Sequence, residues 1–296
     1  MTVLDVIRRS AEFLEAKGVD SPRLQIESLL AHVLGVPRLN LYLNFDRQLG
    51  QPELEAVREL VRRRGNREPL QHLVGSTSFC GLEIRVNRHV LVPRPETELL
   101  AERAWQFLGV LKSSVPAVLD FGTGSGCLAI ALATRCPSAQ VHALDISGEA
   151  LDVARDNAAV NGIAGRIQFH QGDGLAALPR GLSFDLIVAN PPYVPSAEIS
   201  ALAPEAREHD PRVALDGGAD GLDFFRRLAC ESAARLRAGG RLMVEFGDGQ
   251  AERIGEILVQ HKWVVENIEA DYTGRSRTLT ARPERVYIHD AKSPAA

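Results

Sequence analysis

The sequence has no long apolar run and few cysteines, and neither charge predominates. It holds no run of about 18 or more uninterrupted apolar residues, so we expect no transmembrane helix and no membrane partner. Acidic residues recur every few positions in residues 1–18, and no apolar segment there precedes a small-residue cleavage site. This pattern is typical of an amphipathic helix, and we expect neither a signal peptide nor a transit peptide.

The scarcity of cysteine argues against two kinds of stabilisation. The cysteines form no CxxC pair and have no group of histidines beside them; they are Cys80, Cys127, Cys136 and Cys230. We therefore expect no zinc or other metal site, no disulfide framework and a cytoplasmic location.

Net charge bears on the choice of partner. The chain has 34 basic and 38 acidic residues, a net charge of −4. Residues 1–85 hold 12 basic and 11 acidic side chains, whereas residues 86–296 hold 22 and 27, so the larger part is acidic by five charges. A polyanion would be repelled by this part, and we expect no direct contact with nucleic acid.

Local signals divide the chain into unequal parts. Residues 1–75 carry helical apolar periodicity with start and stop signals. Ser21 is predicted as an N-cap with Pro22 at the first helical position, Gly35 ends that helix, and a further helix is predicted from Pro52 to Gly65. We interpret 1–75 as an all-α domain that recognises the substrate. Alternating apolar and polar residues around Gly81 predict a β-hairpin linker over 76–95.

The remainder alternates strands with helices. Helical segments separate apolar, β-rich runs, which fall at 117–121, 140–145, 166–170, 184–190 and 241–246, with two later strands at 263–269 and 275–282. This order predicts an α/β fold with a doubly wound parallel sheet covered by helices on both faces. We assign 96–283 to this catalytic domain and 284–296, which lack a pattern, to a flexible tail.

A glycine loop follows the first of these strands. In the loop, three glycines alternate with small residues: Gly122, Thr123, Gly124, Ser125 and Gly126. Glycines at such positions let the backbone turn sharply and approach a ligand closely. Dinucleotide loops have the spacing G-x-G-x-x-G, whereas this loop reads G-x-G-x-G after Asp120, which favours S-adenosylmethionine as cofactor.

Two aspartates follow neighbouring strands. Asp145 ends the next strand, 19 residues after Gly126, where its carboxylate either binds two ribose hydroxyls or caps a helix. Asp173 either faces the adenine or caps a turn.

The segment Asn190-Pro191-Pro192-Tyr193 follows the strand FDLIVA. Two prolines would suit a rigid turn, but the residue set also suits methylation of a planar NH₂ group. The Asn190 side-chain carbonyl and the Pro191 backbone carbonyl can each accept one N–H, which orients the nitrogen and stabilises its developing charge. Tyr193 offers a flat face. We predict Asn190, Pro191 and Tyr193 as catalytic, and the four residues together as the substrate site.

These motifs resemble a known family. DFGTGSGCLAIALA, ALD and NPPY are similar to class I S-adenosylmethionine-dependent methyltransferases, which have a Rossmann-like fold. GSTSFCGLEIRVNRHVLVPRPETELL, HDPRVALDGGADGLDFFRRL and the helical N-terminal part resemble release factor glutamine methyltransferases over residues 4–282.

The resemblance implies a specific reaction. The enzyme would methylate the side-chain amide of the glutamine in the Gly-Gly-Gln motif of class I release factors and leave S-adenosylhomocysteine. Family contacts to the cofactor would fall on residues 122–126, Asp145 and Asn190. Some members have an aromatic residue beside the adenine where this chain has Gly174, so we transfer no stacking role to it.

Other functions compete with this one. A sister family methylates a glutamine of a large-subunit ribosomal protein and shares both motifs, but RPETE after VLVP favours the release factor branch. Nucleic-acid amino-methyltransferases share NPPY, and the acidic charge argues against them. A non-catalytic S-adenosylmethionine-binding module and a dehydrogenase are disfavoured by the intact NPPY and by the glycine spacing, respectively.

Several features have simpler interpretations. A basic cluster late in the helical domain is either a solvated helix face, which we favour, or a contact for an acidic partner; it comprises Arg58, Arg62, Arg63, Arg64 and Arg67. The stretch 93–96 is either a helix entry or part of the cleft wall. We interpret 217–221 as a flexible loop and helix start, and Phe246 and Tyr272 as core or rim residues.

Overall fold

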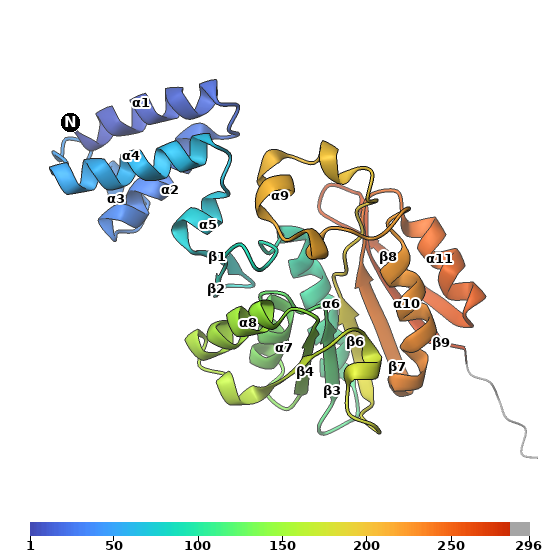
Figure 1. Cartoon of the computed structure of the whole chain (residues 1–296). Helices are drawn as coiled ribbons and strands as arrows, with labels where there is room; N and C mark the ends of the chain where they lie inside the picture. Colours follow the sequence, from blue (N-terminus) through green and yellow to red (C-terminus); the bar gives the residue numbers. More distant parts are fainter. Residues whose placement is uncertain (285–296) are drawn as a thin grey trace, which may run out of the picture.

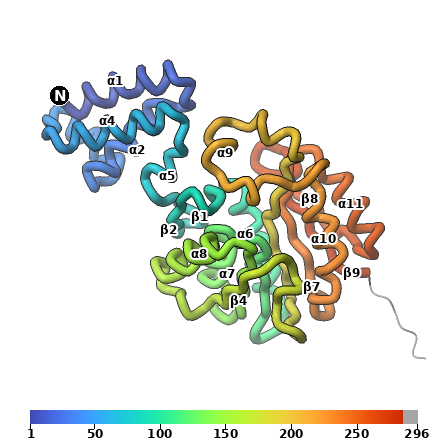
Figure 2. The backbone as a smooth tube through the Cα atoms, viewed as in Figure 1, coloured from blue at the N-terminus to red at the C-terminus, as the bar shows by residue number. Residues whose placement is uncertain are grey.

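The computed structural model describes residues 1–284, so the predicted tail lies outside the described residues except for its first position. Helices at the N-terminus form a separate body beside a larger α/β body, with a short hairpin between them (Figures 1 and 2).

The N-terminal body is a bundle of helices around its own core. Its elements are α1 (Val3–Ala16), α2 (Pro22–Leu34), α3 (Leu39–Tyr42), α4 (Gln51–Gly65) and α5 (Leu70–Val74). Leu14, Ile26 and Leu30 are fully buried between α1 and α2. Ser21 precedes α2 as predicted, but its backbone is left-handed and its side chain makes no capping bond. Pro22 at the first position therefore provides the start signal without help from Ser21.

A hairpin connects the two bodies. Strands β1 (Ser76–Phe79) and β2 (Leu82–Arg85) pair antiparallel through the turn residues Cys80 and Gly81. Both turn residues have positive φ, 52° and 79°, which is the two-residue turn whose twist matches that of paired strands.

The larger body is a seven-stranded sheet in the order β5-β4-β3-β6-β7-β9-β8. The strands are β3 (Ala117–Phe121), β4 (Gln140–Asp145), β5 (Ile167–Gln171), β6 (Phe184–Ala189), β7 (Leu236–Glu245), β8 (Trp263–Ala270) and β9 (Ser276–Pro283). Strands β3 to β7 run parallel, whereas β9 and β8 are antiparallel additions at one edge. The sheet is thus mixed, and strand β7 begins five residues before the predicted run at 241.

Helices cover both faces of the sheet. One apolar core lies under α6 (Pro95–Val110), α7 (Cys127–Arg135) and α8 (Gly148–Val160), and a second lies under α10 (Asp223–Glu231) and α11 (Ala251–Gln260). Strands β3 and β6 are central and almost wholly buried, which explains their apolar sequences. No helix within residues 1–284 is long and apolar enough to cross a bilayer.

Helix α9 (Pro204–His209) lies beside the N-terminal body (Figure 1). Its Glu205 accepts hydrogen bonds from Arg64 at 2.7 Å and from Arg67 at 2.8 Å, both near the end of α4. The Arg64 side chain is only 4% exposed and also donates to Gln25. Arg64 and Arg67 are therefore not part of a solvated face, as we had favoured, but join the two bodies; Arg62 and Arg63 pair locally with Glu59 and Glu68.

These ion pairs make a testable contribution to stability. Burial alone would raise the pKa of Glu205, but the hydrogen bonds from Arg67 and Arg64 outweigh it and lower the pKa to about 2. Since the folded-state pKa is depressed, the stabilisation is complete above the ordinary carboxyl pKa and is lost as the pH falls toward 2.

We expect Glu205→Gln to destabilise the protein by roughly 2 kcal/mol at pH 7, because the substitution leaves the buried Arg64 without its anionic partner. Thermal unfolding monitored by circular dichroism should show a midpoint lower by roughly 5 °C. Glu208→Gln is the matched control, since Glu208 is half-exposed and pairs only with the adjacent Arg207. Equal midpoints for the two variants would contradict this role of Glu205.

Candidate functional site

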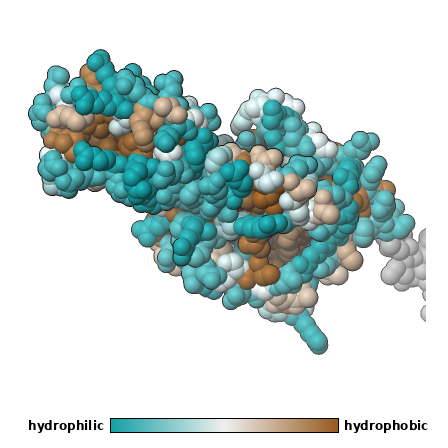
Figure 3. Space-filling model, turned by 45° about the horizontal axis from the view of Figure 1, so that its top comes forward, coloured by the Kyte–Doolittle hydropathy of each residue, from teal (hydrophilic) through white to brown (hydrophobic). Residues whose placement is uncertain are grey.

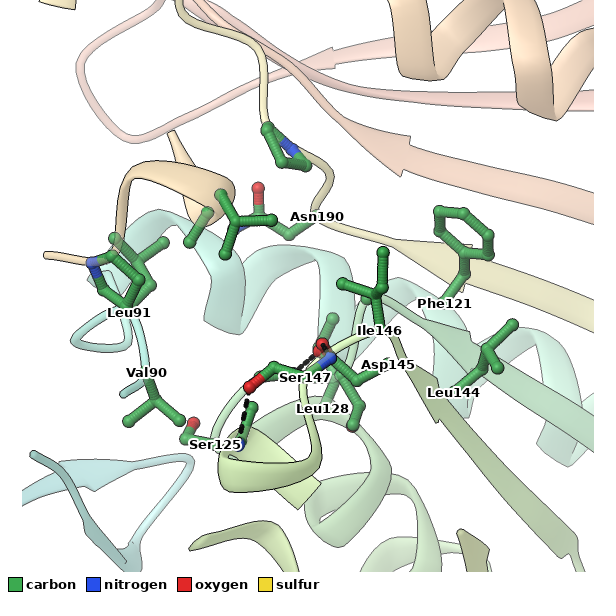
Figure 4. A pocket seen from close by; sticks show the side chains of 18 of the residues that line it. Val90, Leu91, Phe121, Ser125, Leu128, Leu144, Asp145, Ile146, Ser147 and Asn190 are labelled. Atoms are coloured by element: carbon green, nitrogen blue, oxygen red, sulfur yellow. Dashed lines mark hydrogen bonds between the residues drawn. The ribbon is translucent and has the colours of Figure 1, made fainter. Parts of the chain in front are cut away.

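The site lies where three neighbouring strands end at the same edge of the sheet. Phe121, the last residue of β3, is opposite Leu144 of β4 on one side and Ala189 of β6 on the other. The next residues along these strands therefore come together around one cleft. They include Gly122, Asp145 and Asn190, all of which line the cleft. Figure 4 shows the side chains of Asp145 and Asn190 there.

The glycine loop has the backbone shape that its sequence predicts. Gly122, Gly124 and Gly126 have φ of 71°, 53° and 80°, in the region that favours glycine. Residues 122–125 line the cleft, whereas Gly126 does not. A Cβ on Gly126 would lie 3.0 Å from the Cβ of Ala154, so this glycine serves the close packing of α7 on α8.

Asp120 holds the glycine loop from beneath. It is 1% exposed, and one carboxylate oxygen accepts from the Thr123 hydroxyl at 2.6 Å and from the Ala129 backbone N–H at 3.1 Å. Burial raises the pKa of Asp120 to about 7. The carboxyl does not line the cleft, so its function is to fix the loop and the start of α7.

Asp145 is directed across the end of β4. One oxygen accepts from the Gly124 backbone N–H at 2.8 Å and the other from the Ser147 backbone N–H at 2.9 Å (Figure 4). Because a carboxylate has about four acceptor positions, lone pairs remain available for two further hydroxyl donors. Asp145 does not cap the following helix by its side chain; the Ser147 hydroxyl does so.

Asp173 lines the cleft, but its carboxylate pairs with Arg227 of α10. The Arg227 guanidinium lies against Gly174, where a Cβ would come within 2.0 Å of Nη2. Any side chain at Gly174 would clash with the Arg227 guanidinium, so glycine at this position allows Arg227 to lie beside the cleft rim. Asp173 remains two-thirds exposed, so its carboxylate stays accessible.

The residues of the NPPY segment are placed differently from one another. Asn190 and Pro192 line the cleft, whereas Pro191 is buried and Tyr193 packs partly into the core below α10 and α11. Burial raises the pKa of Tyr193. The Asn190 side chain donates from Nδ2 to the Thr97 hydroxyl at 3.0 Å, which leaves Oδ1 as its free end.

The segment 217–221 supports the NPPY turn closely. A Cβ on Gly217 would lie 2.9 Å from the Pro192 carbonyl oxygen, and a Cβ on Gly221 would lie 2.4 Å from that of Tyr193. The Gln250 side chain also donates to the Tyr193 carbonyl, at 2.9 Å. Our interpretation of 217–221 as a flexible loop was therefore incomplete, because the close contact of two backbones requires glycine there.

Other parts of the chain complete the cleft, and of these the sequence had pointed only to the stretch 93–96, as one of two interpretations. Val90 and Leu91 form one wall, opposite Asn190 and Asp145 (Figure 4). Pro93 and Arg94 also line the cleft, which favours the wall interpretation for this stretch. Arg94 donates to the buried Asp210 at 3.0 Å. The remaining lining residues include Thr97, Ile146, Pro211, Val213, Ala214 and Phe224.

No side-chain signal marked these residues, because apolar residues such as Val90 and Val213 look like ordinary core positions in sequence.

Brown apolar surface is visible on the helical body and again in the larger body (Figure 3). Within residues 1–284, no group of three or more His, Cys, Asp or Glu side chains is arranged to hold a metal ion.

Comparison with family models divides the chain in a similar way. Residues 5–75 match the PrmC N-terminal domain, and residues 104–208 match the methyltransferase small domain. The second match includes the glycine loop, Asp145 and the NPPY segment.

Comparison with whole proteins is more specific. The release factor glutamine methyltransferase of Geobacter sulfurreducens is 46% identical over 86% of this chain and 87% of its own. That of Rhodopirellula baltica is 43% identical over 94% and 95%. Among solved structures, the hMettl16 catalytic domain in complex with the MAT2A 3′UTR hairpin 6 has a TM-score of 0.53 at 15% identity, over 70% of this chain and 77% of that one, which shows the shared fold alone. Identity at this level over nearly the whole length, together with the glycine loop and NPPY at one cleft, places the chain in the release factor glutamine methyltransferase family.

Proposed function

We propose that the protein transfers a methyl group from S-adenosylmethionine to the side-chain amide nitrogen of the glutamine in the Gly-Gly-Gln motif of class I release factors. One observation carries the proposal: the Asn190 amide lines the same cleft as the glycine loop and Asp145. A methyl donor and a planar NH₂ acceptor must meet, and this cleft presents the groups suited to each.

The cleft residues fit the cofactor. No atom lies within 4 Å of the position that a Cβ would take on Gly122 or on Gly124. A ligand can therefore approach the backbone closely at both residues. The Asp145 carboxylate has acceptor capacity for the two ribose hydroxyls. The pocket walls, including Val90, Leu91 and Ile146, are largely apolar, as is usual for small-molecule sites. The bound cofactor supplies an electrophilic methyl on a sulfonium.

The acceptor amide is activated by orientation. Its nitrogen lone pair is delocalised, so the amide attacks only when both hydrogens are held by acceptors and the lone pair is aimed at the methyl. Asn190 Oδ1 and the Pro191 carbonyl oxygen would accept one N–H each and stabilise the positive charge that develops on nitrogen. The extra proton then passes to water, so no basic side chain is required.

The helical domain, residues 1–75, is suited to bind the release factor outside the cleft, because the glutamine must enter from a loop of a folded protein. Arg64 and Arg67 are both held by Glu205 of the larger body, so we assign this binding to other residues of the helical domain. The acidic balance of residues 86–296 favours a protein acceptor over nucleic acid.

Labelled S-adenosylmethionine tests the substrate directly. It is offered with a class I release factor, with the same factor lacking the Gly-Gly-Gln glutamine, with a large-subunit ribosomal protein and with DNA. We expect label on the intact release factor alone. Label on the glutamine-substituted factor, or only on the ribosomal protein or DNA, would overturn the proposal.

Asn190→Ala tests the orientation of the acceptor. We expect kcat to fall by about 10²–10³-fold, the usual effect of losing one group that stabilises transition-state charge. Cofactor affinity should change much less, because the glycine loop and Asp145 are intact. Calorimetry measures the affinity, and Asn267→Ala, an exposed position on the edge strand β8, is the control. Unchanged turnover in Asn190→Ala would refute the mechanism.

Asp145→Asn tests the cofactor contact. We expect the dissociation constant for S-adenosylmethionine to rise by about tenfold or more, since hydrogen bonds to a charged acceptor contribute ~1.5–3 kcal/mol. Asp152→Asn, an exposed carboxylate on α8, is the matched control and should bind as the unmodified protein does. Equal dissociation constants for the two variants would remove Asp145 from the cofactor site.

A further inference from the structure

Asn190 can function in only one of two orientations. The oxygen and nitrogen ends of an amide are almost the same size, so packing alone does not select between them. In the structure Nδ2 donates to the Thr97 hydroxyl at 3.0 Å, and Oδ1 is thereby left for the cleft. The reversed amide would present two donors to the N–H groups of the acceptor, which repel them. Something must therefore fix the direction of the Thr97 hydrogen bond.

Thr97 does not fix this direction by itself. Its side chain is in the first turn of α6 and is 2% exposed, so water does not compete for the hydroxyl. A hydroxyl both donates and accepts. If the Thr97 hydrogen pointed at Asn190, the amide oxygen would turn toward it; if the hydrogen pointed elsewhere, Thr97 would accept from Nδ2.

Glu245 lies behind both side chains. It ends β7, the strand next to β6, and is 2% exposed. Thr97 and Asn190 both act as donors that lower the pKa of its carboxyl, which places both side chains beside it, and Oε2 has no hydrogen-bond partner among the described residues. Nothing in the ordinary packing of a strand end explains a carboxyl buried there, since burial of a charge is costly unless it has a function or a partner.

We propose that Glu245 is a positioning residue that, through the Thr97 hydroxyl, sets the Asn190 amide with its oxygen toward the acceptor. A carboxylate only accepts hydrogen bonds. The Thr97 hydroxyl must then donate to Glu245, which leaves only its lone pairs for Asn190, and Nδ2 must turn to meet them. The inference rests on the proposed function, which gives Asn190 Oδ1 its role.

The protonation state of Glu245 matters for this direction. Burial is the main cause that raises its pKa, to about 7, and the charge of Glu96 raises it further. Thr97, Arg277 and Asn190 act in the opposite direction and lower the pKa. Tyr193 is a further titratable neighbour. A protonated Glu245 can donate to Thr97 and no longer imposes one direction, so activity should fall as the pH drops through about 7.

Kinetics of three variants test the proposal. Thr97→Val removes the hydroxyl at constant shape, and we expect kcat to fall about 10- to 100-fold while the dissociation constant for S-adenosylmethionine stays within about threefold. Thr97→Ser restores the hydroxyl and should recover most of kcat. Thr134→Val on α7, whose hydroxyl bonds only to its own helix, is the control. Full activity in Thr97→Val, or no recovery in Thr97→Ser, would overturn the proposal.

Glu245→Gln keeps the shape of the side chain but can donate as well as accept. We expect a lower kcat and loss of the limb near pH 7 in the profile of kcat/KM for the cofactor. The variant comparison is needed because burial gives Asp120 a pKa of about 7 too. Combined with Thr97→Val, Glu245→Gln should add little further loss, since both act through one chain. Additive losses of kcat in the double variant, or a pH profile of Glu245→Gln that still falls near pH 7, would contradict the proposed action of Glu245 through Thr97.

Neutron diffraction separates this inference from the proposed function. The unmodified protein should show both deuterium atoms of Asn190 on the atom facing Thr97, and the Thr97 deuterium directed at Glu245. The opposite arrangement would overturn the inference even if release factor is methylated. The expected arrangement in a protein that fails to label release factor would overturn the proposed substrate and leave the positioning intact.

Discussion

The hydrogen-bonded registry of β3 between β4 and β6 is the constraint on which the site depends. Three parallel strands that end level with Phe121, Leu144 and Ala189 bring the glycine loop, Asp145 and Asn190 to one edge, although 68 residues separate Gly122 from Asn190 in the chain. A shift by one residue would turn each side chain of a strand to the opposite face of the sheet and carry its terminal side chain away from the cleft. The apolar cores on both faces of the sheet hold that registry in place.

Much of the fold and part of the site could be predicted from sequence, because their signals are local. Three motifs can each be recognised within a few residues of sequence. They are the glycine loop after an apolar strand, the aspartate at the end of the next strand and the double proline after another strand. The helical starts at Pro22, Pro52 and Pro95 are equally local, and the structure has helices there. Ser21 illustrates the limit, since residue type suggested a side-chain cap that the left-handed backbone does not make.

The rest depends on contacts between distant segments, and no local pattern encodes them. Arg64 looked like one of several solvated arginines, and its buried position depends on Gln25 and Glu205, which are 39 and 141 residues away. Thr97 and Glu245 belong to a helix start and a strand end that individually look ordinary. The antiparallel placement of β9 beside β7, with β8 outermost, is likewise a matter of tertiary pairing rather than of strand propensity. Gly217 and Gly221 read as a loop because their neighbours, Pro192 and Tyr193, are far away in sequence.

The ion pairs of Arg64 and Arg67 with Glu205 have a geometric consequence. The segment that contains Glu205 continues into Pro211, Val213 and Ala214 on the cleft wall, and Arg94 holds it again through Asp210. The helical body and the methyl-transfer cleft are thereby set at a fixed span. A protein that contacts both must carry its acceptor amide at that same distance from the surface that binds the helical body. Length between two contact points therefore becomes a criterion of selection, independent of the residues that surround the amide.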